Sequence, residues 1–285
     1  CVLRPGAHEQ ELHVRATQLV NNVICGLDEA VHAVGIAHHA DVAHRGGERS
    51  QDRRDVELGI MGEDAHGVAK AEFVAMELAR LVGLDVAKVG LDRALGKDVL
   101  LVERFDRPGD GTRRLMVSAL TILGLHDGDG MAGRYATYVD LAHQIRASFS
   151  EPGMTLSELF SRVTFNVLVG NTDDHARNHA AFWDGVELTL TPAYDICPQG
   201  RTGQEAAQAM AFGPDGDRMS QVARCVAHAP TYHLTTSEAR EIVDHQIDVI
   251  TSNWGEVCGR AKLAAIERSQ LWNRQFLNAF SLYDY

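Results

Sequence analysis

The feature that most limits how this chain can fold is an abrupt change in residue usage near Val68. The first 69 of its 285 residues contain no Phe, Tyr, Trp or Lys. At the whole-chain aromatic content of 6 %, a stretch of that length would hold roughly four aromatic residues, and aromatic side chains dominate core burial. We therefore expect residues 1–67 to be an atypical N-terminal segment, poorly ordered in part, and the packed core to lie in the remainder.

A small mixed unit is predicted for residues 68–107. It begins with a helix, because apolar residues recur at helical spacing from Lys70 to Val82. Gly83 then supplies a left-handed cap at the C-terminal end of this helix.

Two Val- and Leu-rich runs follow the helix. They cover Leu84–Leu91 and Ala94–Glu103, and they predict short strands joined by a turn in the region Asp92–Gly96. A Pro-, Gly- and Asp-rich stretch at residues 104–111 then marks the crossing to the next part of the chain.

Helical patterns dominate residues 108–285. Two capping boxes, Thr155–Glu158 and Thr235–Glu238, each predict the start of an amphipathic helix. Between these helices, the runs Ala181–Trp183 and Glu187–Leu190 predict a hairpin closed by an Asp-Gly turn. The sequence thus favours an α+β protein with a small, atypical α/β lobe and a larger, mainly helical C-terminal lobe.

Composition limits the partners and the location that we expect. The formal net charge of −12 argues against direct coating of nucleic acid, which depends on a surplus of Lys and Arg. Five cysteines without a C-x-x-C spacing fit neither a zinc knuckle nor a disulfide framework. No run approaches the roughly 18 apolar residues that cross a bilayer. We expect a cytoplasmic protein without membrane contact.

Three polar residues have the spacing that phosphoryl transfer needs. Asp173 and Asn178 lie five positions apart in a loop, and Asp195 follows the predicted hairpin. One carboxylate must accept the proton of the attacking hydroxyl, while a second carboxylate and an amide oxygen hold Mg²⁺ against the nucleotide phosphates. Protein kinases use the same D-x-x-x-x-N spacing.

The segments around these residues resemble the C-terminal half of the HipA toxin kinases. The resemblance is carried by Phe165–His179 and Leu190–Asp195. It extends upstream through Lys70–Phe73, Leu101–Arg107 and Ser118–Thr121, in the order that the family shows. It covers about residues 68–265 and implies a protein-kinase-like fold of two lobes with a truncated small lobe.

The resemblance implies a role for each matching residue. Asp173 would be the proton acceptor, and Asn178 and Asp195 would be the Mg²⁺ ligands. The backbone of the connector Glu103–Phe105 would meet the adenine. The residues that would surround ATP are Glu103, Arg104, Phe105, His175, Ala176, Arg177, Asn178, Tyr194 and Asp195.

The activity implied by the resemblance is that of a serine/threonine kinase dependent on ATP and Mg²⁺. The family comprises toxins of type II toxin-antitoxin systems, whose known targets are aminoacyl-tRNA synthetases. A small DNA-binding antitoxin neutralises them, so DNA would be reached only through that partner.

The chain departs from the family pattern upstream of Lys70. The family carries a phosphate-covering loop and an ATP-contacting lysine there, and this chain has no lysine in that region. We interpret residues 1–67 as unrelated to the family. One hypothesis is that this segment comes from a shifted reading frame or a misplaced start. An uninterrupted reading frame at the locus that matches the mass of the protein would refute it. With no lysine to orient, Glu72 and Glu77 are expected to form surface salt bridges.

Two other functions stay open. A degenerate kinase lobe could serve as a binding module without catalysis, and ATP titration with and without Mg²⁺ would distinguish it. A metal-dependent hydrolase could use His175 and His179, which stand four residues apart, together with the neighbouring aspartates. Stoichiometric zinc or iron in the purified protein would identify that class.

Overall fold

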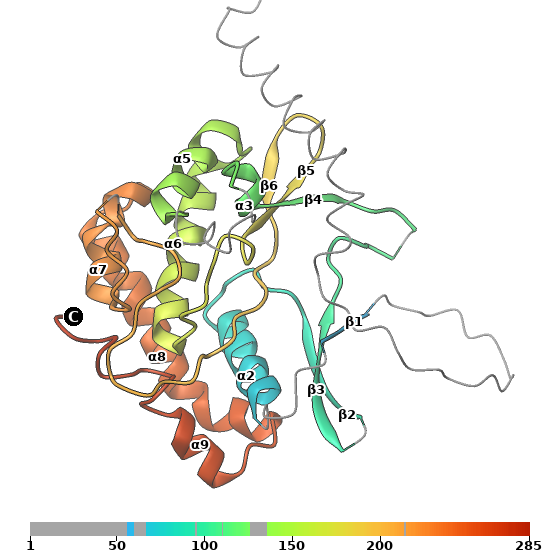
Figure 1. Cartoon of the computed structure of the whole chain (residues 1–285), viewed down its shortest axis with the longest axis vertical. Helices are drawn as coiled ribbons and strands as arrows, with labels where there is room; N and C mark the ends of the chain where they lie inside the picture. Colours follow the sequence, from blue (N-terminus) through green and yellow to red (C-terminus); the bar gives the residue numbers. More distant parts are fainter. Residues whose placement is uncertain (1–55, 60–66, 95, 110, 126–135, 214) are drawn as a thin grey trace, which may run out of the picture. The chain divides into compact units, whose positions relative to one another are not determined.

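The computed structural model describes residues 56–59, 67–94, 96–109, 111–125, 136–213 and 215–285 (Figure 1). These residues belong to one unit, which spans residues 53–285. They form a mixed α+β structure, as predicted. We expected residues 1–67 to pack weakly. Apart from the strand at 56–59 and Gly67, these residues lie outside the described part of the chain.

Helix α2 (Val68–Leu81) confirms the first predicted helix. Its residues from Ala71 to Ala79 are all buried, because the helix contacts β2 (Val89–Ala94), β3 (Lys97–Glu103) and the long helix α8 (Thr236–Arg260). Gly83 follows the helix with φ +93°, the left-handed conformation that such an end requires.

The first sheet has the strand order β1-β3-β2, with all neighbours antiparallel. Strand β1 (Val56–Gly59) pairs with the whole C-terminal half of β3. The predicted start of a strand at Leu84 was wrong. Val86 forms an isolated bridge with Ala193 outside this sheet, and β2 begins only at Val89. Of the predicted turn region Asp92–Gly96, the first three residues instead extend β2 to Ala94, whereas Gly96 lies in the turn that leads into β3.

The second sheet has the order β4-β5-β6, again antiparallel. It contains the predicted hairpin, observed as β5 (Ala180–Trp183) and β6 (Leu188–Leu190). Strand β4 (Leu115–Ser118) adds an edge that the sequence did not suggest. The short helix α3 (Ala119–Ile122) follows it directly and starts with a hydrogen bond from the Thr121 amide to Ser118 Oγ.

Helix α6 (Pro152–Val169) is the centre of the helical part. Its last seven residues are all buried, and it contacts α5 (Tyr138–Ser148), α7 (Val222–Ala227) and α8 (Figure 1). A single turn of 3₁₀ helix, Ala229–Tyr232, also packs against it. The helix ends at Gly170, beside the loop that carries the candidate residues.

The two predicted capping boxes had different outcomes. At α8 the box is confirmed, because Thr235 Oγ1 accepts from the Glu238 amide and Glu238 Oε2 accepts from the Thr235 amide. The box at Thr155 was wrong. Helix α6 begins three residues earlier at a proline, which is well suited to a first helical turn, and Thr155 Oγ1 donates to the Glu151 carbonyl instead.

The last helix, α9 (Ala265–Leu271), leads into the C-terminal turns. Among the helices of the described residues, none is long and apolar enough to cross a membrane.

Candidate functional site

The candidate loop begins where α6 stops. Gly170 has φ +72°, and a Cβ atom there would lie 2.7 Å from the Gln275 carbonyl oxygen. Only glycine fits both conditions without strain. The chain then turns out of the helix, with the Asn171 amide donating to the Asn166 carbonyl at 2.9 Å.

The loop and the segment after the hairpin meet at Asp195. Asn178 Nδ2 donates to Asp195 Oδ2 at 2.6 Å. The Asp195 carbonyl oxygen accepts from the side-chain amides of Asn171 at 3.3 Å and Asn178 at 3.4 Å. Asp195 itself has φ +58°, so its backbone lies in the left-handed region. Two segments that are far apart in sequence thus share one hydrogen-bonded contact.

Several carboxylates crowd this contact. The pKa of Asp195 is raised, first by loss of hydration against the protein and further by the nearby Asp173 and Asp174 carboxylates. His175 and the Asn178 hydrogen bond act in the opposite direction. Asp173 is exposed, so its carboxylate is open to a substrate from solvent. A cation is favoured where carboxylates gather in this way.

The donor atoms at this contact suit Mg²⁺. Within the described part of the chain, Asn178 Oδ1 is buried and has no hydrogen-bond partner, although buried acceptors are normally satisfied. Together with the Asp195 carboxylate it provides the hard oxygen ligands that Mg²⁺ prefers, and phosphates and water complete such sites in nucleotide enzymes. The residues present therefore fit a magnesium ion held jointly with a nucleotide.

The predicted phosphate lining lies around the same loop. Tyr194 Oη donates to the Arg177 carbonyl at 2.6 Å, which ties the loop to the segment that carries Asp195. Ala176 is buried, and its carbonyl accepts from the Leu120 amide at 3.0 Å. His175 interacts electrostatically with Asp195. The structure thus brings together the predicted residues 173, 175–178, 194 and 195.

The predicted adenine connector reaches this group through its aromatic residue. The Phe105 ring centroid lies 5.7 Å from that of Tyr194 and 6.0 Å from that of Phe182. Arg104 pairs with Asp106 through two hydrogen bonds of 2.7 Å. The Glu103 amide donates to the Lys88 carbonyl. The connector therefore runs from the end of β3 into a turn at Phe105, whose ring lies next to Tyr194.

The expectation of surface salt bridges on α2 was wrong for Glu72. Its side chain is only 7 % exposed, and burial, with a further contribution from Asp195, raises its pKa to about 7. Glu77 does form ion pairs, to Arg260 at 2.8 Å and Arg80 at 3.2 Å, but it is buried as well. Both glutamates are covered because α2 packs between the first sheet and α8.

His179 does not join a metal site with His175. Its Nε2 atom lies 3.0 Å from Asp174 Oδ1 in the core, and Tyr138 Oη donates to Asp174 Oδ2 at 2.6 Å. Within the residues that the structure describes, no three His, Cys, Asp or Glu side chains are placed to hold a metal ion. The hydrolase hypothesis thus loses the histidine pair on which it depended.

Sequence reasoning missed three parts of this arrangement: Tyr138, Asn171 and the burial of Glu72. Tyr138 is 36 residues from Asp174, and nothing local marks it as a partner. Asn171 lies inside the recognised segment, so its position was a usable signal.

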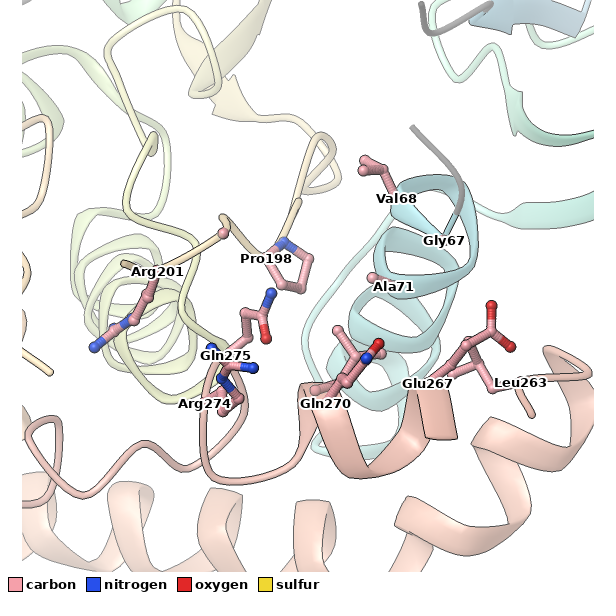
Figure 2. Close-up of a pocket in the computed structure, with 12 residues that line it drawn as sticks. Gly67, Val68, Ala71, Pro198, Arg201, Leu263, Glu267, Gln270, Arg274 and Gln275 are labelled. Atoms are coloured by element: carbon pink, nitrogen blue, oxygen red, sulfur yellow. The ribbon is translucent and has the colours of Figure 1, made fainter. Parts of the chain in front are cut away.

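A separate cavity of about 330 Å³ lies beside the chain that continues from Asp195. Figure 2 shows it between the first turn of α2, the loop bearing Pro198 and Arg201, and α9 with the turn at Arg274 and Gln275. Its lining does not include Asp173, Asn178 or Asp195.

The fold of the described residues is similar to that of two solved structures. The structure of HipA of Shewanella oneidensis MR-1 in complex with HipB and operator DNA matches with a TM-score of 0.61 and 22 % identity, covering 79 % of this chain and 59 % of that one. The crystal structure of the Helicobacter pylori proinflammatory kinase CtkA matches with a TM-score of 0.53 and 13 % identity, covering 79 % and 88 %.

A comparison with protein families identifies the chain more specifically than its fold does. The family model for the HipA-like C-terminal domain matches residues 55–254, and the chain belongs to this family. The match starts before the expected limit near residue 68 and ends before 265. The interpretation of residues 55–67 as unrelated to the family is thereby corrected, and strand β1 within this stretch pairs with β3.

Curated relatives support the same family at low identity. "Putative kinase Y4mE" of Sinorhizobium fredii is 31 % identical over 135 residues, which are 46 % of this chain and 32 % of the relative. "Serine/threonine-protein kinase toxin HipA" of Shewanella oneidensis is 28 % identical over 150 residues, 47 % of this chain and 35 % of the relative. The aligned part of the chain thus spans about a third of each relative's length.

Proposed function

We propose that this chain is the catalytic part of a HipA-type serine/threonine protein kinase that transfers the γ-phosphate of ATP to a protein hydroxyl. The observation that carries the proposal is the 2.6 Å contact between Asn178 and Asp195, with exposed Asp173 on the same loop. We assign α2 and β1–β3 to a small lobe and residues 108–285 to a helical lobe, as in two-lobed kinases.

Asp173 would accept the proton of the attacking hydroxyl, because it is the exposed carboxylate of the loop. Asn178 and Asp195 would hold Mg²⁺, since they supply one orphaned amide oxygen and one carboxylate. When bound, the ion neutralises charge on the transferred phosphoryl group. The hydrogen bonds from Asn171 and Asn178 orient Asp195 for this task.

ATP would lie with its adenine at the backbone of Glu103–Phe105 and its phosphates along His175–Asn178 and Tyr194. The ring contact between Phe105 and Tyr194 supports this assignment, since it brings the connector next to the phosphate lining. Substitution of the connector side chains would then have mild effects, because backbone atoms would contact the base.

For the whole protein we propose a toxin of a type II toxin-antitoxin pair in the cytoplasm. Its target class would be the aminoacyl-tRNA synthetases, and its partner a small DNA-binding antitoxin. The name of the Shewanella relative and its structure with HipB and operator DNA support this role.

The second candidate is a binding module with a kinase fold and no transfer. Buried Glu72 favours it, because a kinase uses such a glutamate to orient its ATP lysine, and no lysine occurs in residues 1–69.

Calorimetric titration of the purified full chain with ATP, with and without Mg²⁺, tests the proposal. Transfer of labelled γ-phosphate to the chain itself and to bacterial aminoacyl-tRNA synthetases is followed in parallel. A kinase binds ATP more tightly with Mg²⁺ and transfers phosphate. No binding of ATP, or binding without transfer, would rule out the kinase and favour the binding module.

A further inference from the structure

A buried polar cluster lies directly behind the candidate loop. Asp174 is 2 % exposed. Its carboxylate accepts a hydrogen bond from Tyr138 Oη at 2.6 Å, and His179 Nε2 lies 3.0 Å from it. Tyr138 and His179 are 0 % and 3 % exposed. We call these three residues the Asp174 cluster. An ionised carboxylate only accepts hydrogen bonds, so the contact requires the proton on His179 Nε2.

The buried Asp174 carboxylate has several hydrogen-bond partners. Burial alone would raise the pKa of Asp174, but His179, Tyr138 and Asn166 outweigh it and hold the pKa below its ordinary value. A buried carboxylate without such partners is strongly unfavourable. The three partners therefore fix where the Asp174 side chain lies.

The Asp174 cluster is continuous with the contacts of Asp195. Asn166 hydrogen-bonds to Asp174, and its Oδ1 accepts from Asn171 Nδ2 at 3.0 Å. The same Asn171 amide group donates to the Asp195 carbonyl. Hydrogen bonds thus run from the first residue of α5, through the end of α6, to the segment with the candidate magnesium ligand.

Each of the two candidate loop residues is directly followed in sequence by a member of the cluster. Asp174 follows Asp173, and His179 follows Asn178. Because the side chains of Asp174 and His179 are fixed in the core, the backbone that presents Asp173 to solvent and Asn178 to Asp195 is fixed at both points. Tyr138 reaches them from another helix, so the restraint does not depend on the loop alone.

We infer that Tyr138, Asp174 and His179 are positioning residues that hold the loop of Asp173 and Asn178 in the geometry for phosphoryl transfer. The inference rests on the proposed function. None of the three touches a reacting atom in this arrangement. Their effect would pass through the neighbouring residues, where a displacement of about 1 Å can cost roughly 10²-fold in rate.

Tyr138→Phe is the sharpest test, because it removes one hydroxyl and keeps the ring that stacks on Phe212 and meets His179 edge-on. We expect kcat for γ-phosphate transfer to fall about tenfold, with KM for ATP changed less than about twofold. Hydrogen exchange of amides 171–178 should become faster. Asp174→Asn should act in the same direction and more strongly.

Thr164→Val is the matched control. Thr164 is also fully buried, and its hydroxyl donates to Gln246 Oε1 at 3.0 Å on α8 and to the carbonyls of Phe160 and Ser161 within α6. We expect this variant to lose thermal stability while kcat and the exchange of amides 171–178 stay at the wild-type values. A purely structural role of Tyr138 would make the two variants behave alike.

The outcomes separate the inference from the function on which it rests. An active wild type with unchanged kcat and loop exchange in Tyr138→Phe overturns the inference alone. Equal losses of kcat in Tyr138→Phe and Thr164→Val overturn it as well. If the wild type neither binds nor uses ATP, the proposed function fails, and the exchange measurement decides by itself whether the cluster orders the loop.

Discussion

Asp173 and Asp174 are neighbours in sequence with opposite surroundings. Asp173 is exposed, whereas Asp174 is buried among Tyr138, His179 and Asn166. The D-x-x-x-x-N spacing pointed to Asp173 as the proton acceptor, and this role stays a prediction. It could not show the role of Asp174, because burial depends on residues far away in the sequence. The candidate site was thus predictable where it is local.

Asp173→Ala should lower γ-phosphate transfer by roughly 10²–10⁴-fold, since it removes the proposed proton acceptor. Affinity for ATP with Mg²⁺ should stay near that of the wild type, because Asn178 and Asp195 keep their contact. Transfer assays and calorimetry measure the two quantities. Asp248→Ala, on the exposed face of α8, serves as the control. Full transfer by Asp173→Ala would remove it from this role.

Glu72 gives the chain a pH-dependent stability. Burial and Asp195 raise its pKa from 4.5 to about 7. Between these values the unfolded chain releases the proton first, so stability falls as pH rises from about 4.5 and levels off above about 7. The difference between the pKa of Glu72 in the unfolded and folded chain corresponds to a loss of roughly 3 kcal/mol in the free energy of unfolding over this pH range.

Glu72→Gln should therefore unfold at higher urea concentration than the wild type at pH 8 and show little difference at pH 4.5. Urea unfolding without Mg²⁺ and nucleotide is the measurement. The exposed Glu256→Gln should leave the pH dependence unchanged. Equal pH profiles for wild type and Glu72→Gln would contradict the assignment.

At the scale of elements, prediction succeeded where the pattern was regular and local. Helix α2 and the β5-β6 hairpin were found from their periodicity and turn residues. Strand β2 was misplaced because Val86 pairs with Ala193, a contact between residues distant in sequence. The start of α6 was missed because Pro152 begins the helix ahead of the apparent capping box.

The end of α6 sets a strict local requirement. Gly170→Ala would place a Cβ 2.7 Å from the Gln275 carbonyl at a positive φ, so we expect unfolding to become easier by about 2 kcal/mol. Gly153→Ala, in the first turn of the same helix with no atom within 4 Å, should be neutral or stabilising. Urea unfolding of both variants compares the two positions, and equal effects would contradict the argument.

At the scale of the whole molecule, the family and the mixed α+β fold were predicted, but the start of the family match was not. The match reaches residue 55, in a region where residue usage suggested no relation. A short strand such as β1 has too few residues to show a pattern by itself. The reading-frame hypothesis concerns residues before it that lie outside the described structure.

Nucleotide binding should stabilise the whole chain. ATP with Mg²⁺ at about 100 times its dissociation constant adds about 2.7 kcal/mol, which corresponds to a rise in Tm of roughly 5–10 °C. Asp195→Asn tolerates the left-handed backbone but lacks the carboxylate charge, so it should lose the part of the rise that needs Mg²⁺. Thermal unfolding scans test this, and a rise that persists in the variant would argue against Asp195 as a ligand.

The family match ends at residue 254, yet the candidate loop depends on later residues. The Gln275 carbonyl lies against Gly170, and the Leu277 amide donates to the Leu168 carbonyl at 2.7 Å. A recombinant version that ends at the family boundary would therefore lack the residues that pack against the end of α6. Inactivity of such a shortened chain would say nothing about the chemistry of Asp173.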